Sequence, residues 1–310
     1  MTDLERVYAP LRRVARLPVT RDQSMMLMAA VNEIFLGIDT FLAHSISGTI
    51  RPLEWIPIVF GPAAGAVLLL AGLIAGRGGT EAWNSRRRAA SFLASGVLGL
   101  SIVVGLLGAY FHLVRAILPT GPLGERVTVD LIVWAPPILG PLTFALVGLL
   151  GISAAWLEDP PGSGRLMLSA RRWIHLPYSK TRAFFFMISL GTLATVISAV
   201  LDHARTHFEN PWLWVPTLAG VLGTVVAATL GALDRPGSWD LRIYVLAMTL
   251  LILVGLVGAW LHIRDNLAFG GTVVIERFIR GAPFLAPLLF CNMGALGWIV
   301  LMDPDELRRG

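Results

Sequence analysis

Four of the six histidines in this chain form two matched pairs that could bind a metal. His44 coincides with His203 when the sequence is shifted by 159 residues, and His112 coincides with His262 at a shift of 150 residues. Two neutral imidazole nitrogens on opposite faces of a planar ring are what a bis-histidine haem requires. We therefore expect His44 with His112, and His203 with His262, to be the metal ligands of one or two haems b.

Glycines and arginines near these histidines extend the prediction. The spacing Gly-x-x-Gly-x-x-x-His places its three residues on one helical face, and it occurs at Gly105, Gly108 and His112 and again at Gly255, Gly258 and His262. A face without side chains lets a flat macrocycle approach the backbone, so these glycines are expected to bind the cofactor. Arg115 and Arg264 follow the histidines closely, where haem propionates need cationic partners.

Other interpretations of the same residues stay open. The histidines could bind a non-haem metal or carry protons, or they could be amphipathic boundary residues with a purely structural role. Gly-x-x-Gly faces also commonly pack one membrane helix against another.

Two acids could carry proton chemistry in the first half of the chain. Glu33 and Asp39 lie well inside an apolar run, where an ionisable side chain costs about 2.5–3.5 kcal/mol, and the second half has Thr192 and Ser198 instead. Glu33 lies about 16 Å inward of His44 on the same helical face, so we expect it to relay protons or to bind a polar ligand. Asp39 points about 140° away from His44. A structural bond to another helix is the alternative for each acid.

The composition indicates what kind of protein positions these residues. Of the 310 residues, 55% are hydrophobic and only 15% are charged, whereas a soluble domain has about 25% charged residues. The mean hydropathy is +0.70. A single cysteine, Cys291, excludes disulfide frameworks and cysteine zinc sites. The basic residues lie between long apolar runs, so the net charge of +5 indicates membrane topology, and no nucleic acid partner is expected.

Eight apolar runs are long enough to cross a bilayer core of about 30 Å as helices. They are Ser24–His44, Ile56–Ala75, Ala89–Val114, Leu131–Leu157, Ala183–Leu201, Pro211–Leu233, Ile243–Ile263 and Ala282–Met302. We therefore predict an all-α integral membrane protein with eight transmembrane helices in contact with the lipid bilayer.

The distribution of basic residues predicts the orientation. With the N-terminus inside, 18 Arg and Lys residues fall in inner segments and 7 in outer segments. This excess places both the N and C termini in the cytoplasm. No cleavable signal peptide is expected, because the first 23 residues are too polar. The preference for Arg over Lys suggests GC-rich bacterial coding, and hence a multi-pass protein of the bacterial cytoplasmic (inner) membrane.

The halves of the chain match as a tandem repeat of four spans each. Besides the histidines, Trp55 coincides with Trp214, and Pro137 and Pro141 coincide with Pro283 and Pro287. An even number of spans gives two parallel four-helix bundles. The predicted organisation is an interfacial N-terminal segment (1–23), a first four-helix repeat (24–160), a cytoplasmic interfacial linker (161–182), a second four-helix repeat (183–303) and a cytoplasmic tail (304–310).

Together these features predict the membrane subunit of a respiratory redox complex, and hence a part of a quinone-linked oxidoreductase. Haem b near the outer face would pass electrons between quinone and a periplasmic redox protein or another subunit. In layout alone, the chain is similar to the eight-span, two-bundle quinol-interacting anchors of the polysulfide-reductase type, and none of its motifs is specific to that family. The alternatives are a transporter or channel in which Glu33 and Asp39 line the path, and a cofactor-free anchor for a periplasmic protein.

Overall fold

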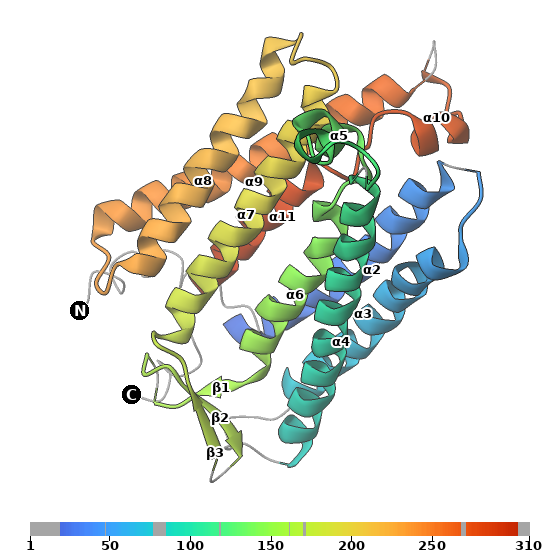
Figure 1. Ribbon diagram of the computed structural model, residues 1–310. Helices are drawn as coiled ribbons and strands as arrows, with labels where there is room; N and C mark the ends of the chain where they lie inside the picture. Colours follow the sequence, from blue (N-terminus) through green and yellow to red (C-terminus); the bar gives the residue numbers. More distant parts are fainter. Residues whose placement is uncertain are drawn as a thin grey trace.

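The computed structural model of the protein is built mainly of α-helices (Figure 1). It describes residues 19–46, 48–76, 85–117, 119–160, 162–169, 172–267 and 271–302. The long helices are α2 (Arg21–Ser45), α3 (Trp55–Gly76), α4 (Ser85–Arg115), α6 (Leu139–Ala155), α7 (Lys180–Ala204), α8 (Trp214–Ala232), α9 (Ser238–Asn266) and α11 (Leu288–Val300). Short elements are η1 (Pro52–Glu54), η2 (Leu123–Glu125), α5 (Val129–Trp134), η3 (Pro211–Leu213) and α10 (Ile275–Arg280).

Six helices in the described part of the chain are long and apolar enough to cross a membrane. Their ranges are Arg21–Ser45, Pro52–Ile74, Ser85–Arg115, Lys180–Ala204, Pro211–Ala232 and Ser238–Asn266. Large apolar side chains on the outward faces are exposed, among them Leu70, Leu100, Leu218 and Leu246. Such a surface fits lipid contact. The prediction of an α-helical, multi-pass membrane protein is confirmed to this extent.

The other two predicted spans are interrupted. The run 131–157 divides into α5 and α6, and the run 282–302 contains a turn before α11. At about 1.5 Å per residue, α6 and α11 are shorter than a bilayer core. Pro137 and Pro141 explain the first break and Pro283 and Pro287 the second, because proline lacks the N–H that a continuing helix needs.

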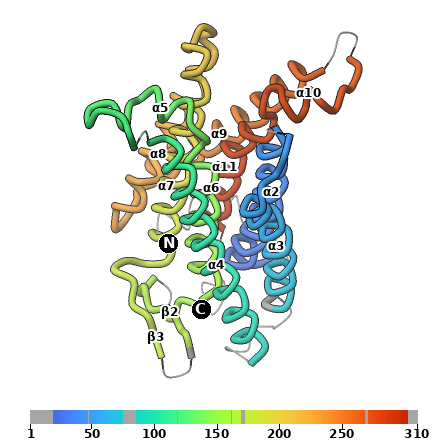
Figure 2. The backbone as a smooth tube through the Cα atoms, turned by 45° about the vertical axis from the view of Figure 1, so that its right-hand side comes forward, coloured from blue at the N-terminus to red at the C-terminus, as the bar shows by residue number. Residues whose placement is uncertain are grey.

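The eight long helices form two bundles that pack side by side. In the first bundle, α2 packs on α3, α3 on α4, α4 on α6, and α6 on α2, so α2 and α4 are diagonal neighbours. In the second bundle α7, α8, α9 and α11 follow the same order. The bundles meet where α6 packs on α7 and α11 on α2. Figure 2 shows α5 and α10 at one end of the molecule and the strands at the other.

Matched side chains begin the first helix of each bundle. Thr20 accepts a hydrogen bond from the amide of Gln23 at 3.1 Å, and Ser179 accepts one from the amide of Arg182 at 3.4 Å. Thr20 and Ser179 coincide at the 159-residue shift. Both are N-caps, which supply an acceptor to amides that have no partner within the helix.

A small antiparallel sheet joins the bundles at the end opposite α5 and α10. It contains β1 (Leu157–Glu158), β2 (Arg165–Ser169) and β3 (Arg172–His175). The all-α fold class did not include these short strands, two of which lie in the predicted linker over 161–182. Buried Glu158 holds the linker in place, because its carboxylate accepts the amides of Gly164 at 2.7 Å and Lys180 at 3.0 Å. The predicted tail 304–310, and the N-terminal segment before residue 19, lie outside the described residues.

Candidate functional site

The structure brings His44 and His112 together. They lie in the last turns of α2 and α4, and their ring centroids are 6.1 Å apart with the ring planes at 67°. Two imidazoles that bind one metal ion from opposite sides at about 2.0–2.1 Å have centroids roughly 6 Å apart. The separation of this pair therefore suits a shared metal ion.

The first pair also has partners for its second ring nitrogens. His112 Nδ1 lies 3.0 Å from the carbonyl oxygen of Pro137, and His44 Nδ1 lies 3.4 Å from Glu54 Oε2. A carbonyl only accepts, so Nδ1 of His112 donates and a neutral ring keeps its lone pair on Nε2. Metal-binding histidines almost always donate their other N–H to a carbonyl or a carboxylate. The carbonyl beside His112 Nδ1 and the carboxylate near His44 Nδ1 are partners of the kind that ligating histidines have.

Glu54 is the site residue that sequence reasoning missed. Its carboxylate also lies 3.8 Å from Arg115 Nη2 and accepts the amide of Arg51 at 2.8 Å. Arg115, expected to face a haem propionate, is thus placed beside a protein carboxylate. The repeat holds the one available signal, because the position that corresponds to Glu54 in the second half is Leu213.

The second pair shares the carbonyl contact of the first, whereas the ring of His203 packs against Phe208, with ring centroids 6.1 Å apart. His262 Nδ1 lies 3.1 Å from the carbonyl oxygen of Pro283. His203 is close enough to His262 for their charges to interact, and Asp202 interacts with both rings. Arg264 lies exposed at the end of α9. The second site therefore combines two imidazoles with a neighbouring carboxylate on α7 itself.

The described residues offer few further metal ligands. Across the described ranges, no group of three or more His, Cys, Asp or Glu side chains is arranged to hold a metal ion. A bare metal ion in a protein usually takes at least three protein ligands. Two imidazoles alone are instead typical of a haem, whose macrocycle supplies the other four ligands.

The glycines do not form the predicted cofactor surface. A Cβ at Gly105 would lie 2.5 Å from the backbone nitrogen of Ala145, and one at Gly108 would lie 2.7 Å from Pro141 Cβ. In the second bundle, Gly255 faces Cys291 and Gly258 faces Pro287 in the same way. These glycines therefore let α4 approach α6 and α9 approach α11, which is the packing alternative.

Glu33 is fully buried inside the first bundle. Its Oε1 lies 2.5 Å from the hydroxyl of Ser101, which also donates to the carbonyl of Phe144 at 2.8 Å. A serine hydroxyl has one proton and cannot donate to both oxygens. Both contacts are satisfied when Glu33 is neutral and donates its own proton to Ser101. The second oxygen, Oε2, has no hydrogen-bond partner within the described residues.

Asp39 faces the second bundle rather than the histidines of the first. Its carboxyl is close enough to Asp202 of α7 for the two charges to interact. Glu33 therefore contacts Ser101 within the first bundle, whereas Asp39 interacts with a residue of the second bundle.

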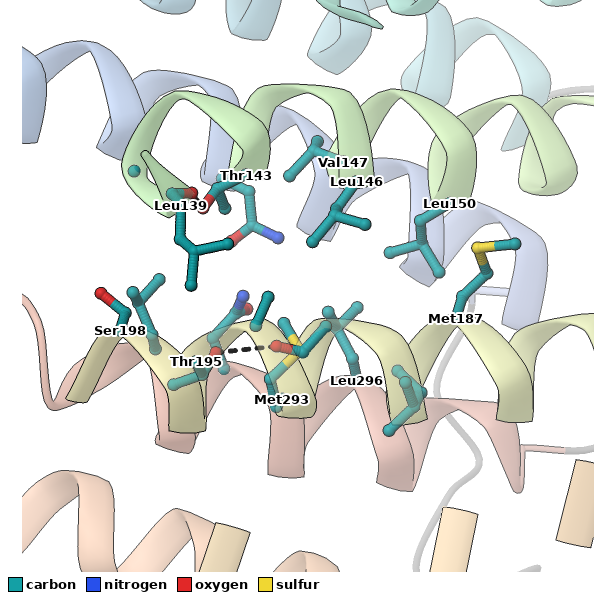
Figure 3. Close-up of a pocket in the computed structure, with 17 residues that line it drawn as sticks. Leu139, Thr143, Leu146, Val147, Leu150, Met187, Thr195, Ser198, Met293 and Leu296 are labelled. Atoms are coloured by element: carbon teal, nitrogen blue, oxygen red, sulfur yellow. Dashed lines mark hydrogen bonds between the residues drawn. The ribbon is translucent and has the colours of Figure 1, made fainter. Parts of the chain in front are cut away.

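A cavity of about 60 Å³ lies where α2, α6, α7 and α11 meet. Figure 3 shows side chains of α6 pointing across it toward those of α7 and α11. The walls are mainly aliphatic, and five polar side chains line it, which are Asn32, Thr143, Thr195, Ser198 and Asn292. None of the four paired histidines lines this cavity, nor do Glu33 and Asp39.

A buried polar cluster joins the bundles at the ends nearest the sheet. Arg21 begins α2 and Lys180 begins α7, at matching positions of the repeat, and they are 2% and 0% exposed. Arg21 Nη1 donates to Thr181 Oγ1 at 2.7 Å, while Lys180 Nζ pairs with Asp22 and donates to the carbonyl of Trp156 at 2.5 Å. Position 22 coincides with position 181, so the two contacts are reciprocal, as at a two-fold interface.

The chain matches no protein-family model, and no curated protein or solved structure shows significant similarity to it.

Proposed function

We propose that this chain is the membrane subunit of a respiratory redox complex in a bacterial cytoplasmic membrane. It binds haem b and passes electrons between quinone and a protein partner on the outer side. The observation that supports this best is the His44–His112 pair, with ring centroids 6.1 Å apart and an acceptor oxygen beside each Nδ1. The second pair, His203 and His262, is the proposed site of a second haem.

Each side chain has a defined task in this proposal. His44 and His112 would hold a haem from the ends of diagonal helices, and the haem would supply one-electron chemistry when bound. Arg115 and Arg264 lie at the same end and provide positive charge for propionates. Glu33 is proposed to take part in proton transfer as a neutral acid that can give up its proton, since its carboxyl is fully buried and its Oε2 has no hydrogen-bond partner in the described part of the chain. The glycine faces of α4 and α9 do not support haem binding, because proline side chains and backbone atoms from α6 and α11 pack against them.

The proposed topology has eight membrane crossings in two tandem, parallel bundles with both termini in the cytoplasm. It is supported by matched N-caps at Thr20 and Ser179, and by the reciprocal contacts of Arg21 and Lys180. Each interrupted span completes its crossing through the segment before α6 or α11. The excess of basic residues at the inner segments supports the orientation.

Haem content of the purified protein tests this function. We expect a Soret band, and we expect His112→Asn to lower the haem bound per chain by about one. Asparagine keeps an N–H donor near the position of Nδ1, so it can still bind the Pro137 carbonyl while it lacks Nε2. His44→Ala should have the same effect. His175→Ala is the matched control, because His175 lies exposed in β3, away from both pairs.

A colourless but folded wild-type protein would contradict the redox proposal. So would a haem content that neither His44→Ala nor His112→Asn changes. Such results would favour a transporter or a cofactor-free anchor. Of these two, the transporter has less support from the residues that line the cavity. An ion path through lipid usually needs ionisable groups along it, and the residues that line the cavity between α2, α6, α7 and α11 include none.

A further inference from the structure

We propose that the cavity between the bundles binds the ring of a quinone or quinol that enters from the bilayer. This inference rests on the proposed redox function and gives its substrate a defined site. It places that site between α2, α6, α7 and α11, apart from both histidine pairs.

An unpartnered amide is the first observation. Asn32 is 9% exposed and lines the cavity, and its Nδ2 has no hydrogen-bond partner within the described residues. A buried amide without a partner destabilises a protein, and native structures rarely contain one. The cavity therefore should contain an acceptor oxygen for Asn32. Asn292 brings a second amide to the cavity from α11.

The other polar groups define the ligand further. Thr143 donates to the carbonyl of Leu139 at 3.1 Å, and Thr195 donates to the carbonyl of Gly191 at 2.9 Å. Their hydroxyl protons are thus used, and their oxygens can only accept from a ligand. The site offers amide donors to a quinone carbonyl and hydroxyl acceptors to a quinol O–H. Its lining residues include no ionisable side chain, which favours a neutral ligand.

The size fits a single ring. A space of about 60 Å³ holds roughly four to six water molecules, which occupy about 120–180 Å³ in the liquid. One six-membered ring with two oxygens requires a similar volume. Met187 and Met293 line the same space, and methionine side chains adapt readily to the shape of a ligand. Ordered water is the other source of acceptor oxygens, so the experiment must separate the two.

The cavity also extends toward the histidines. Leu139 and Gly140 line it, and they directly follow the segment whose Pro137 carbonyl accepts the hydrogen bond of His112. On α7, Ser198 lines the cavity five residues before His203. A ring bound here would therefore lie inward of both proposed haems, on the path from the membrane interior to the outer face.

Binding of a short-chain 1,4-benzoquinone to the full-length protein in detergent, measured by calorimetry, tests the proposal. Asn32→Leu and Asn292→Leu keep the side-chain shape and remove the amide, and each should weaken binding about tenfold. Thr229→Val is the matched control, because Thr229 lies exposed on α8 and bonds only its own helix. It should leave the affinity unchanged.

A photoreactive azidoquinone gives a second measurement that does not depend on the variants folding. Labelling of α2, α6, α7 or α11 in the wild type supports the site, and labelling elsewhere overturns it. The proposal is also overturned if the wild type binds no quinone, because the cavity then holds only water. It is overturned as well if both asparagine variants bind quinone with the affinity of the wild type. Haem content measured on the same samples separates this failure from failure of the redox function, because haem would persist when only the quinone site is wrong.

Discussion

Pro141 gives a structural reason for the position of His112 near the end of α4. Pro141 has no N–H, so it cannot donate to the carbonyl of Pro137 as a continuing helix would. His112 Nδ1 supplies that hydrogen bond from a neighbouring helix at 3.0 Å. The second bundle repeats the arrangement with Pro287, Pro283 and His262. There the Pro283 carbonyl also accepts a hydrogen bond from the amide of Ala286 at 3.1 Å. These histidines thus have a structural task besides any role as ligands.

The two tasks of His112 can be separated by substitution. In haem-free protein, His112→Ala should lower the free energy of unfolding by about 1–3 kcal/mol, because it leaves the Pro137 carbonyl without this donor. His112→Asn should keep most of the stability, since its amide can replace Nδ1. Denaturation in detergent measures both variants. Equal losses in the two variants would show that the carbonyl bond does not stabilise the protein.

At the scale of the helix, the residue spacing predicted which side chains of α4 share a face. It did not predict what that face would contact. The positions of Gly105, Gly108 and His112 give one stripe on α4 from the sequence alone. Whether the stripe meets a ligand or another helix depends on the position of α6, which no local pattern determines. Pro141 and Ala145 of α6 pack into the stripe, and this close approach between the helices accounts for the failure of the cofactor prediction.

Two glycines of α4 give a matched test of that packing. Gly105→Ala should destabilise the protein by about 1–3 kcal/mol, because its Cβ would overlap the backbone of α6. Gly99→Ala should be neutral or stabilising by up to about 1 kcal/mol, because nothing lies within 4 Å of its Cβ and alanine favours a helix. Thermal unfolding of both variants measures the difference. A Gly105→Ala protein as stable as Gly99→Ala would contradict close packing of α4 on α6.

For the whole molecule, composition predicted the membrane class, and the repeat predicted which residues correspond. Hydropathy could not show the breaks before α6 and α11, because it counts apolar residues without regard to backbone bonds lost at proline. Nor could it show which faces of the bundles meet. Asn32 and Asn292 lie far apart in the sequence, and only packing of α2 and α11 brings both to one cavity. Glu54 was missed for a similar reason. It lies near His44 only because the chain turns back after α2, which the sequence pattern does not show.

Buried charged side chains join the two bundles near the sheet, and their contribution to this contact can be measured. Lys180 is fully buried and pairs with Asp22, so Asp22→Leu should cost about 3–5 kcal/mol, because it removes the carboxylate that pairs with a buried ammonium. The double variant Asp22→Leu/Lys180→Met should recover most of that loss, because an apolar pair of similar volume can replace a buried ion pair. Asp234→Ala, in an exposed pair with Arg182, is the control and should cost less than about 1 kcal/mol. Denaturation in detergent of the wild type, Asp22→Leu, Lys180→Met and the double variant gives the coupling between Asp22 and Lys180 directly. If the single and double variants were equally unstable, the stability at this contact would come from apolar packing, and the ion pair would not hold the bundles together.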